Sequence, residues 1–325
     1  MKYVVIGAGG TGGAIGGFLT KAGKDVTLIA RGKHLSAMRE HGLRFETVDD
    51  AYAVPVYACT MEEYMASVVS CAGTNGSCVN ARPDVIFVCV KGYSLEDTVP
   101  FIRQVAHKDT VVIPILNIYG TGGRLQQRLP ELTVTDGCIY IAAEIKCPGT
   151  ILLSGKIFRV VYGLRRGTSQ EITDRVMPVL CQVESDLIEA GIMPVLSDQI
   201  ERDALQKFSM VSPMAASGAY YDEQTGVFQT EGKYRDTYVA LVQEVYALSQ
   251  AMNIALPENI VEINLQIMDS LAPGASASMH RDIRDGKQSE VDGLVYEVVR
   301  LGQQYGVAVP TYEKIAAELH ARLDG

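Results

Sequence analysis

A glycine-rich segment near the start of the chain constrains the fold more than any other feature of the sequence. Lys2–Ile6 is short, apolar and rich in β-branched residues, so it predicts a buried strand. Gly7–Gly12 follows with the spacing G-x-G-x-x-G and leads into Gly12–Ala22, which has the pattern of a helix. A strand, a tight glycine turn and a helix in this order form the start of a βαβ unit, the context in which this motif binds a dinucleotide.

The glycines of this turn have separate physical roles in dinucleotide binding. The first permits the tight turn, the second lets the backbone approach a pyrophosphate, and the third lets the helix pack closely against the strand. The pyrophosphate then lies against amide groups at the helix N-terminus. A purely structural turn is the alternative, and the position between strand and helix favours binding. The residues that we assign to this site are Gly7, Gly9, Gly10, Thr11 and Gly12.

The residues after the second predicted strand indicate which dinucleotide binds. Asp25–Ala30 predicts a strand, and NAD-binding domains place an acidic residue at its end to hold the ribose 2′-hydroxyl. Here Arg31, Gly32 and Lys33 follow, without a carboxylate. An arginine can pair with a 2′-phosphate through charge-assisted, bidentate hydrogen bonds. We therefore interpret Arg31 as a ligand of NADPH rather than as a solvated surface arginine.

Strand and helix patterns alternate along the first half of the chain. This alternation predicts an α/β fold with a Rossmann-type, doubly wound parallel sheet. Arg44–Thr60 is expected to form a pair of shorter strands, and Cys138–Glu144 and Ile151–Tyr162 are expected at the edge of the sheet. The remaining elements are a helix over Leu35–His41 and buried strands over Val85–Val90 and Val111–Leu116.

The segment 61–84 interrupts this alternation. It is polar and rich in small residues, so it predicts a surface loop or an insertion. We assign no chemistry to it and interpret Cys71 and Cys78 as bystanders.

After about residue 197 the sequence pattern changes to helices. Apolar residues recur at helical spacing and predict an all-α second domain. We expect a NADP-binding Rossmann-type domain over residues 1–197 and a helical substrate and catalytic domain over residues 198–325. The helical sets are Tyr238, Val242, Val245 and Met252; Leu294, Val298, Leu301 and Tyr305; and Ile315, Leu319 and Leu323.

Composition excludes several classes of function. The net charge of -9 disfavours a nucleic-acid-binding protein, because phosphate binding needs clustered Lys and Arg. No apolar run approaches the length that spans a bilayer, so no membrane contact is expected. The cysteines form no C-x-x-C pair and are odd in number, which favours free thiols in a reducing, cytoplasmic compartment over disulfides or a metal site.

Several motifs resemble those of the ketopantoate reductase (2-dehydropantoate 2-reductase) family. That family carries a glycine motif, an arginine after the second strand and a later Val-Lys pair, here Val90-Lys91. Asn117 stands where the family reads Asn-Gly-x-Gly. The more specific match is C-terminal: Ser276–Ile283 followed by Glu290–Gly293 resembles Ser-Met-x-x-Asp-Ile…Glu-Ile-Asp…Gly, with Gly306–Pro310 resembling Gly-Ile-x-x-Pro. The resemblance covers nearly the whole chain except 61–84.

The resemblance implies roles for individual residues. Lys207 matches the catalytic lysine, a general acid that protonates the carbonyl oxygen as hydride reaches the carbon. Glu290 matches the glutamate that supports the lysine and the substrate, and Ser278 matches the serine that contacts the substrate carboxylate. Asn117 and Lys91 match residues at the junction of cofactor and substrate. Physically, a cation near a ketone stabilises the negative charge that develops on its oxygen.

One departure from the family affects the substrate. Members that act on ketopantoate often carry asparagines four and eight residues after the lysine, where this chain has Val211 and Ala215. Three nearby serines, Ser209, Ser212 and Ser217, are candidates for replacing the lost hydrogen bonds.

Three functions remain open on this reading. The first is NADPH-dependent reduction of 2-dehydropantoate to pantoate in pantothenate and coenzyme A synthesis. The second is a related NADPH-dependent reductase of another 2-keto acid. The third is a non-catalytic NADPH-binding sensor, which the presence of both Lys207 and Glu290 disfavours. The partner is a small 2-keto acid, no metal is expected, and a homodimer is compatible with the sequence, which does not fix the oligomeric state.

Overall fold

The computed structural model describes residues 1–71 and 82–323 and divides into two compact units. The first comprises Met1–Leu116 and Gly120–Ile200, and the second comprises Asn117–Tyr119 and Glu201–Gly325. The chain passes from the first unit to the second between Ile200 and Glu201, and the short segment at Asn117 belongs with the second unit. Within the described residues no helix is long and apolar enough to cross a membrane.

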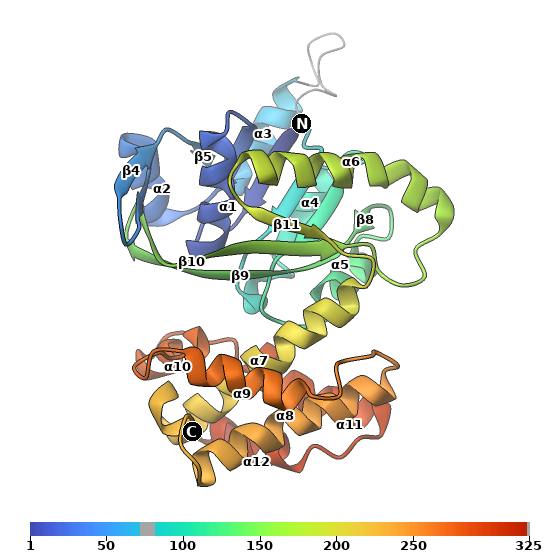
Figure 1. Cartoon of the computed structure of the whole chain (residues 1–325). Coiled ribbons are helices and arrows are strands. Elements are labelled where there is room, and N and C mark those ends of the chain that lie inside the picture. The colour runs from blue at the N-terminus through green and yellow to red at the C-terminus, as the bar shows by residue number, and fades with distance from the viewer. Residues whose placement is uncertain (72–81, 324–325) are drawn as a thin grey trace. The chain divides into compact units, whose positions relative to one another are not determined.

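The first unit contains the predicted parallel sheet, with six strands in the order β5-β2-β1-β6-β7-β8 (Figure 1). Every neighbouring pair of these strands is parallel. The chain leaves β1 toward β2 on one side and continues from β6 toward β7 on the other, so the order reverses between β1 and β6. The strands are β1 (Lys2–Ile6), β2 (Asp25–Ile29), β5 (Tyr57–Cys59), β6 (Val85–Val88), β7 (Val111–Pro114) and β8 (Thr133–Val134).

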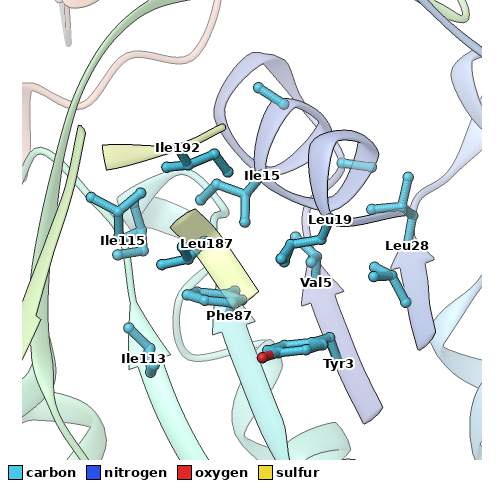
Figure 2. Close-up of a cluster of buried hydrophobic side chains, with 14 of the residues drawn as sticks. Tyr3, Val5, Ile15, Leu19, Leu28, Phe87, Ile113, Ile115, Leu187 and Ile192 are labelled. Carbon is cyan, nitrogen blue, oxygen red and sulfur yellow. The ribbon is translucent and has the colours of Figure 1, made fainter. Parts of the chain in front are cut away.

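Apolar side chains cover both faces of this sheet. Side chains alternate between the faces of a strand, so Tyr3 and Val5 enter one core while Val4 and Ile6 enter another. Figure 2 shows the first of these cores, where Ile15 and Leu19 of α1 lie over the strands beside Leu187 and Ile192. The helices of the first unit are α1 (Gly10–Lys21), α2 (Gly32–His41), α3 (Met61–Cys71), α4 (Thr98–Val105), α5 (Thr121–Arg128) and α6 (Gln170–Glu189), with a short 3-10 helix at Gly92–Ser94.

A second sheet of five strands corrects one expectation from the sequence. The strands expected at the edge of the parallel sheet form this separate sheet instead, because β9 and β10 pair with each other as a long antiparallel hairpin. β10 also pairs in parallel with β3 and β11. Arg44–Thr60, where a pair of strands was expected, overlaps three strands: β3 and β4 belong to this second sheet, and β5 belongs to the first. The bounds are β3 (Leu43–Glu46), β4 (Ala51–Val54), β9 (Asp136–Cys147), β10 (Thr150–Gly163) and β11 (Met193–Leu196).

Four helices of the first unit were not predicted, namely α3, α4, α5 and α6. The start of the segment that we expected to be a loop, Met61–Cys71, is α3, and its Tyr64 and Val68 are buried against α4. The polar composition of 72–81, which lies outside the described residues together with Cys78, hid this helical start. The sequence also contained a signal for α6: Ser169 caps its first turn by accepting the Ile172 N–H, and apolar residues follow at helical spacing.

The second unit is helical, as predicted (Figure 1). Buried residues of α7, α8, α11 and α12 form one core in which Tyr238, Val298 and Ile315 are almost fully inaccessible. Two residues expected on the buried faces, Tyr305 and Leu323, are instead exposed because each lies at the last turn of its helix. The helices are α7 (Ile200–Tyr221), α8 (Lys233–Ala251), α9 (Ile260–Ser270), α10 (Ser278–Arg284), the π-helical turn Asp292–Tyr296, α11 (Glu297–Tyr305) and α12 (Pro310–Leu323), with a short 3-10 helix at Thr225–Phe228.

Candidate active site

The turn between β1 and α1 has the geometry that its glycines require. Gly7 has φ +91°, and a Cβ there would lie 2.9 Å from the Cys89 carbonyl oxygen. A Cβ at Gly12 would lie 2.2 Å from the Gly7 carbonyl oxygen, and one at Gly10 would lie 2.5 Å from the Ala143 carbonyl oxygen. Each of these three positions therefore excludes a side chain, because its Cβ would collide with a backbone carbonyl oxygen.

Gly9 differs from the other three glycines. A Cβ at Gly9 would meet no atom of the described residues within 4 Å. The backbone at this position is therefore open on the side where a side chain would stand, although the rest of the turn is tightly packed. A surface without a Cβ, beside the first turn of α1 where Gly10 and Thr11 begin the helix, fits the approach of a pyrophosphate.

The carboxyl ends of β1 and β6 lie together at the point where the strand order reverses. In open α/β sheets this switch point is where ligands bind. The glycine turn follows β1, and Val90, directly before Lys91, has its Cγ1 atom 3.1 Å from the position of a Gly7 Cβ. Lys91 is half-buried and precedes the short helix Gly92–Ser94. The structure thus brings the segment of Lys91 to the glycine turn.

Arg31 lies two residues beyond the end of β2 and directly precedes the first turn of α2. Its side chain is exposed. β2 is the neighbour of β1 on the side opposite to β6, so Arg31 follows the strand whose end holds the ribose group in dinucleotide-binding domains. An exposed guanidinium at this place fits a 2′-phosphate.

Lys207 and Asn117 meet in the second unit although 90 residues separate them. Lys207 lies on α7 and is only 7% exposed, and its Nζ donates a hydrogen bond of 2.6 Å to Asn117 Oδ1. A buried ammonium needs polar partners because removal from water disfavours its charge.

Glu290 and Ser278 lie in the same unit as Lys207. Glu290 is 6% exposed, and its backbone carbonyl accepts the Leu294 N–H as the helical segment begins. Ser278 is half-buried and starts α10. The residues just before Ser278 line a cavity of about 10 Å³ together with Gly218. This volume holds about one water molecule and is too small for a 2-keto acid.

Gly293 is a functional candidate that the sequence analysis quoted only as part of a motif. It lies in the π-helical turn Asp292–Tyr296, and a Cβ there would lie 2.3 Å from Ile118 Cδ1 and 3.0 Å from Ile118 Cγ2. Ile118 is buried and directly follows Asn117. The glycine therefore gives the segment of Asn117 room to pack, and π-helical turns are frequent at functional sites.

The three serines expected to replace the lost asparagines are already committed to other hydrogen bonds. All are fully buried. Ser212 Oγ lies 2.6 Å from both the Leu294 carbonyl oxygen and the Tyr312 hydroxyl. Ser217 Oγ donates to the Pro213 carbonyl, and Ser209 Oγ donates to the Gln206 carbonyl. This expectation was wrong because the serines stabilise the helical core.

Pro213 explains part of this arrangement. A proline inside α7 has no N–H for the carbonyl four residues earlier, which is that of Ser209. The buried Asn264 side chain donates to this carbonyl oxygen and to Ser209 Oγ, each at 3.0 Å. Ala215 is fully buried and Val211 is half-buried, so the face of α7 beyond Lys207 is apolar.

Outside these sites, the described cysteines and acidic residues suggest no metal chemistry. Cys59, Cys89, Cys138, Cys147 and Cys181 are free thiols. Within the described residues no cluster of three or more His, Cys, Asp or Glu side chains is placed to hold a metal ion.

Comparison with family models identifies both units. The model described as "Ketopantoate reductase PanE/ApbA" matches residues 3–167. The model described as "Ketopantoate reductase PanE/ApbA C terminal" matches residues 199–323. Together they cover most of the chain, including the glycine turn and Lys207.

Individual relatives are similar over their whole length. An uncharacterized oxidoreductase, YkpB, of Bacillus subtilis is 24% identical over 319 residues, which are 98% of each chain. A 2-dehydropantoate 2-reductase of Aquifex aeolicus is 22% identical over 326 residues, 99% of this chain and 97% of its own.

Solved structures share the fold at similarly low identity. A PanE/ApbA family ketopantoate reductase from Ralstonia eutropha has a TM-score of 0.84 at 24% identity, covering 100% of this chain and 99% of its own. D-mandelate dehydrogenase with NADH and anilino(oxo)acetate also has a TM-score of 0.84, at 22% identity and with the same coverage. With both of its units matched by the family models, the chain belongs to the ketopantoate reductase family of oxidoreductases.

Proposed function

We propose that this protein reduces 2-dehydropantoate to pantoate with NADPH, in the synthesis of pantothenate and coenzyme A. The observation that carries the proposal is the hydrogen bond between the buried Lys207 ammonium and Asn117, two residues that the family resemblance independently assigns to the reaction. Family membership and the open glycine turn add support.

In this proposal Lys207 is the general acid. A nicotinamide cofactor, when bound, would supply the hydride for the ketone carbon, so that the electron pair of the C=O double bond is left on oxygen. Lys207 stabilises the developing oxyanion and transfers a proton from Nζ to it, which completes the alcohol. Asn117 holds the ammonium through its Oδ1 atom and so fixes the direction of the remaining N–H groups. Glu290 is proposed to support the lysine, and Ser278 to bind the substrate carboxylate.

Binding of the cofactor is proposed to use the first unit. Backbone amides at Gly9, Gly10 and Thr11 would receive the pyrophosphate, and Arg31 would pair with the 2′-phosphate. The positive charge of an exposed arginine favours NADPH over NADH, since NADH has no phosphate at this position. Lys91 is proposed to lie near the nicotinamide end of the cofactor.

A second candidate function is the reduction of a 2-keto acid with an apolar side chain. The buried, committed serines and the apolar Val211 favour it, because none offers a hydrogen bond to the distal hydroxyl of 2-dehydropantoate. Loss of one ordinary hydrogen bond weakens binding by about 0.5–1.5 kcal/mol, which lowers selectivity but does not abolish turnover. 2-Dehydropantoate therefore remains the first choice, with poor discrimination expected against hydroxyl-free analogues such as 2-keto-isovalerate.

A panel of 2-keto acids assayed with NADPH tests both candidates. We expect turnover of both 2-dehydropantoate and 2-keto-isovalerate. A site that fully hydrogen-bonds the hydroxyl of 2-dehydropantoate could favour it over 2-keto-isovalerate by about 10⁴ in kcat/KM, and we expect a ratio far below this value. A larger ratio would show that the hydroxyl is well bonded. Turnover of other 2-keto acids without activity on 2-dehydropantoate would support the second candidate, and an absence of turnover on the whole panel would leave the cofactor-binding sensor.

A further inference from the structure

We propose that His34 is a positioning residue for the cofactor, which holds the peptide between Ala8 and Gly9 in the orientation that receives a pyrophosphate. The inference rests on the proposed function and concerns a residue outside the glycine motif. His34 lies in the first turn of α2, half-buried, three residues after Arg31.

Both ring nitrogens of His34 have backbone partners from other parts of the first unit. The Nε2 atom lies 2.9 Å from the Ala8 carbonyl oxygen, and the Gly149 N–H donates to Nδ1 at 3.0 Å. Because Nδ1 accepts a hydrogen bond from Gly149, it carries no hydrogen in the neutral ring. The ring hydrogen is therefore on Nε2, which donates it to the Ala8 carbonyl oxygen. Burial lowers the pKa of His34, opposed by the bond to Ala8, and this is consistent with a neutral ring in this tautomer.

The contact to Ala8 fixes a peptide plane in the glycine turn. The Ala8 carbonyl and the Gly9 N–H belong to one peptide unit, and the described residues contain no cis peptide bond. In a trans peptide the C=O and N–H bonds point in opposite directions. The Gly9 N–H therefore points away from the His34 ring, and among the described residues it donates no backbone hydrogen bond.

Without His34 little in the local chain would prevent this peptide from turning over. Rotation of a peptide unit changes ψ of the residue before it and φ of the residue after it, and Gly9 tolerates nearly every φ. A reversed peptide would present the Ala8 carbonyl oxygen in place of the Gly9 N–H, and an anion would then meet an acceptor instead of a donor. The Ala8 N–H is already held by the Ile29 carbonyl, so His34 supplies the second anchor of the residue.

The Gly149 contact keeps the ring itself in place. Gly149 lies in the turn between β9 and β10 with φ +78°, and a Cβ there would lie 2.8 Å from the Ala37 Cβ. The hairpin thus packs directly on α2. The Gly149 N–H then orients the imidazole, so that its Nε2–H is directed at Ala8.

Two substitutions separate the two ring nitrogens. In His34→Gln the side-chain amide nitrogen reaches the position of Nε2 and can still donate to Ala8. In His34→Asn the shorter side chain reaches only the position of Nδ1, so the Gly149 bond can be kept while the Ala8 bond is lost. His41→Gln, on the exposed end of the same helix, is the matched control.

The experiment measures the Kd of each full-length variant for NADPH and for NADH by nicotinamide fluorescence, which is clear of tryptophan signal because the chain contains no Trp. We expect His34→Asn to raise both Kd values by the same factor, roughly three- to tenfold, the effect of one neutral hydrogen bond. His34→Gln and His41→Gln should bind within about twofold of the wild type, since their Ala8 contact is kept. The kcat of every variant at saturating NADPH should be unchanged, because His34 does not act on the reacting atoms.

Other outcomes have distinct meanings. Equal Kd values for all variants, or equal weakening by Gln and Asn in chains whose thermal unfolding shows an intact fold, would overturn the role of the Ala8 bond. If His34→Asn does not fold, His34→Ala, which removes the Ala8 contact as well, takes its place: weaker binding in His34→Ala beside native affinity in His34→Gln supports the proposal, and native affinity in both overturns it. A wild type that binds neither nucleotide would overturn the proposed function together with this role, whereas binding that is indifferent to His34 overturns only the latter.

Discussion

At the scale of single residues, the proposed chemistry depends on one buried cation. Lys207 is 7% exposed and bonded to Asn117, so its ammonium is held in one place before any substrate binds. Preorganisation of this kind lets a donor act on an oxyanion without reorganising during the reaction. A flexible surface lysine would have to lose its conformational freedom at that moment.

Replacement of Lys207 by alanine should therefore lower kcat. We expect Lys207→Ala to reduce turnover by about 10²–10⁴-fold, the range typical for loss of a general acid. NADPH affinity should change little, because the pyrophosphate and 2′-phosphate are assigned to the first unit. Steady-state kinetics with 2-dehydropantoate and a parallel NADPH titration check this, with Lys314→Ala on α12 as the control. Near-normal turnover in Lys207→Ala would remove this lysine from the mechanism.

Cofactor choice is a second property of a single side chain. Arg31 is exposed at the end of β2, so its guanidinium is available to a 2′-phosphate. We expect the wild type to prefer NADPH by about ten- to a hundredfold, which corresponds to the roughly 1.5–3 kcal/mol of a charge-assisted contact. Arg31→Ala should remove most of this preference and leave the Kd for NADH as an unchanged internal reference. Equal affinity of the wild type for both cofactors would contradict the assignment.

At the scale of elements, two helix irregularities lie close in sequence to Lys207 or to Glu290. Pro213 interrupts the hydrogen bonding of α7 just beyond Lys207, and Asn264 of α9 donates to the buried Ser209 carbonyl that the proline leaves without a helical partner. The π-helical turn after Glu290 presents Gly293 to Ile118, next to Asn117. Both departures from regular helices have packing partners that fit them, Asn264 for the first and Ile118 for the second.

A methyl group at Gly293 should disturb the site indirectly. The Cβ of Gly293→Ala would displace the whole Ile118 side chain, and overpacking of this kind costs about 1–3 kcal/mol. Because Asn117 adjoins Ile118, we expect kcat to fall by about tenfold while NADPH affinity is kept. Gly302→Ala is the matched control, since its Cβ would overpack against Val309 in the same unit. A similar loss of kcat in both variants would indicate general destabilisation instead.

At the scale of the whole molecule, each unit has its own apolar core, and the first also contains a buried polar network. Asp186 of α6 is 3% exposed; it accepts hydrogen bonds from the Tyr3 hydroxyl at 2.5 Å and from Gln182 at 3.0 Å, and pairs with Lys24 at 2.9 Å. Burial alone would raise the pKa of Asp186, but the bonds from Tyr3, Lys24 and Gln182 outweigh burial and lower it. The network joins β1, α6 and Lys24, which lies in the turn between α1 and β2.

This network should make the stability of the first unit depend on acid pH. A carboxyl whose pKa is lowered by folding stabilises the fold fully above its ordinary value of 3.8 and loses this contribution as the pH falls through the lowered value. We expect Asp186→Asn to lower the free energy of unfolding at pH 7 by about 1.5–3 kcal/mol. The difference from the wild type should shrink below pH 3.8.

Urea unfolding at neutral and acid pH measures this difference. Glu189→Gln is the control, because Glu189 also pairs with Lys24 but is 57% exposed and should contribute about 0–1 kcal/mol. A loss in Asp186→Asn that stays constant down to the lowest pH would show that the carboxylate charge is not the source of the stabilisation.

The sequence by itself determined the class of the fold and the candidate residues. The glycine turn, the alternation of strands and helices and the later helical spacing are local patterns, and local hydrogen bonding and side-chain periodicity produce them. The parallel sheet and the helical second unit were predicted correctly for that reason. The motifs around Lys207, Ser278 and Glu290 also lie in short stretches of sequence.

Tertiary structure decided what depends on residues distant in sequence. Strand pairing is not encoded within a strand, so only the fold showed that β9 and β10 form a second sheet with β3. Burial and hydrogen bonding removed the serines of α7 from the candidate site. Only the fold showed that Lys207 bonds to Asn117 and His34 to Ala8. The two partners of each hydrogen bond are distant in sequence, and no local pattern specifies that they meet in space.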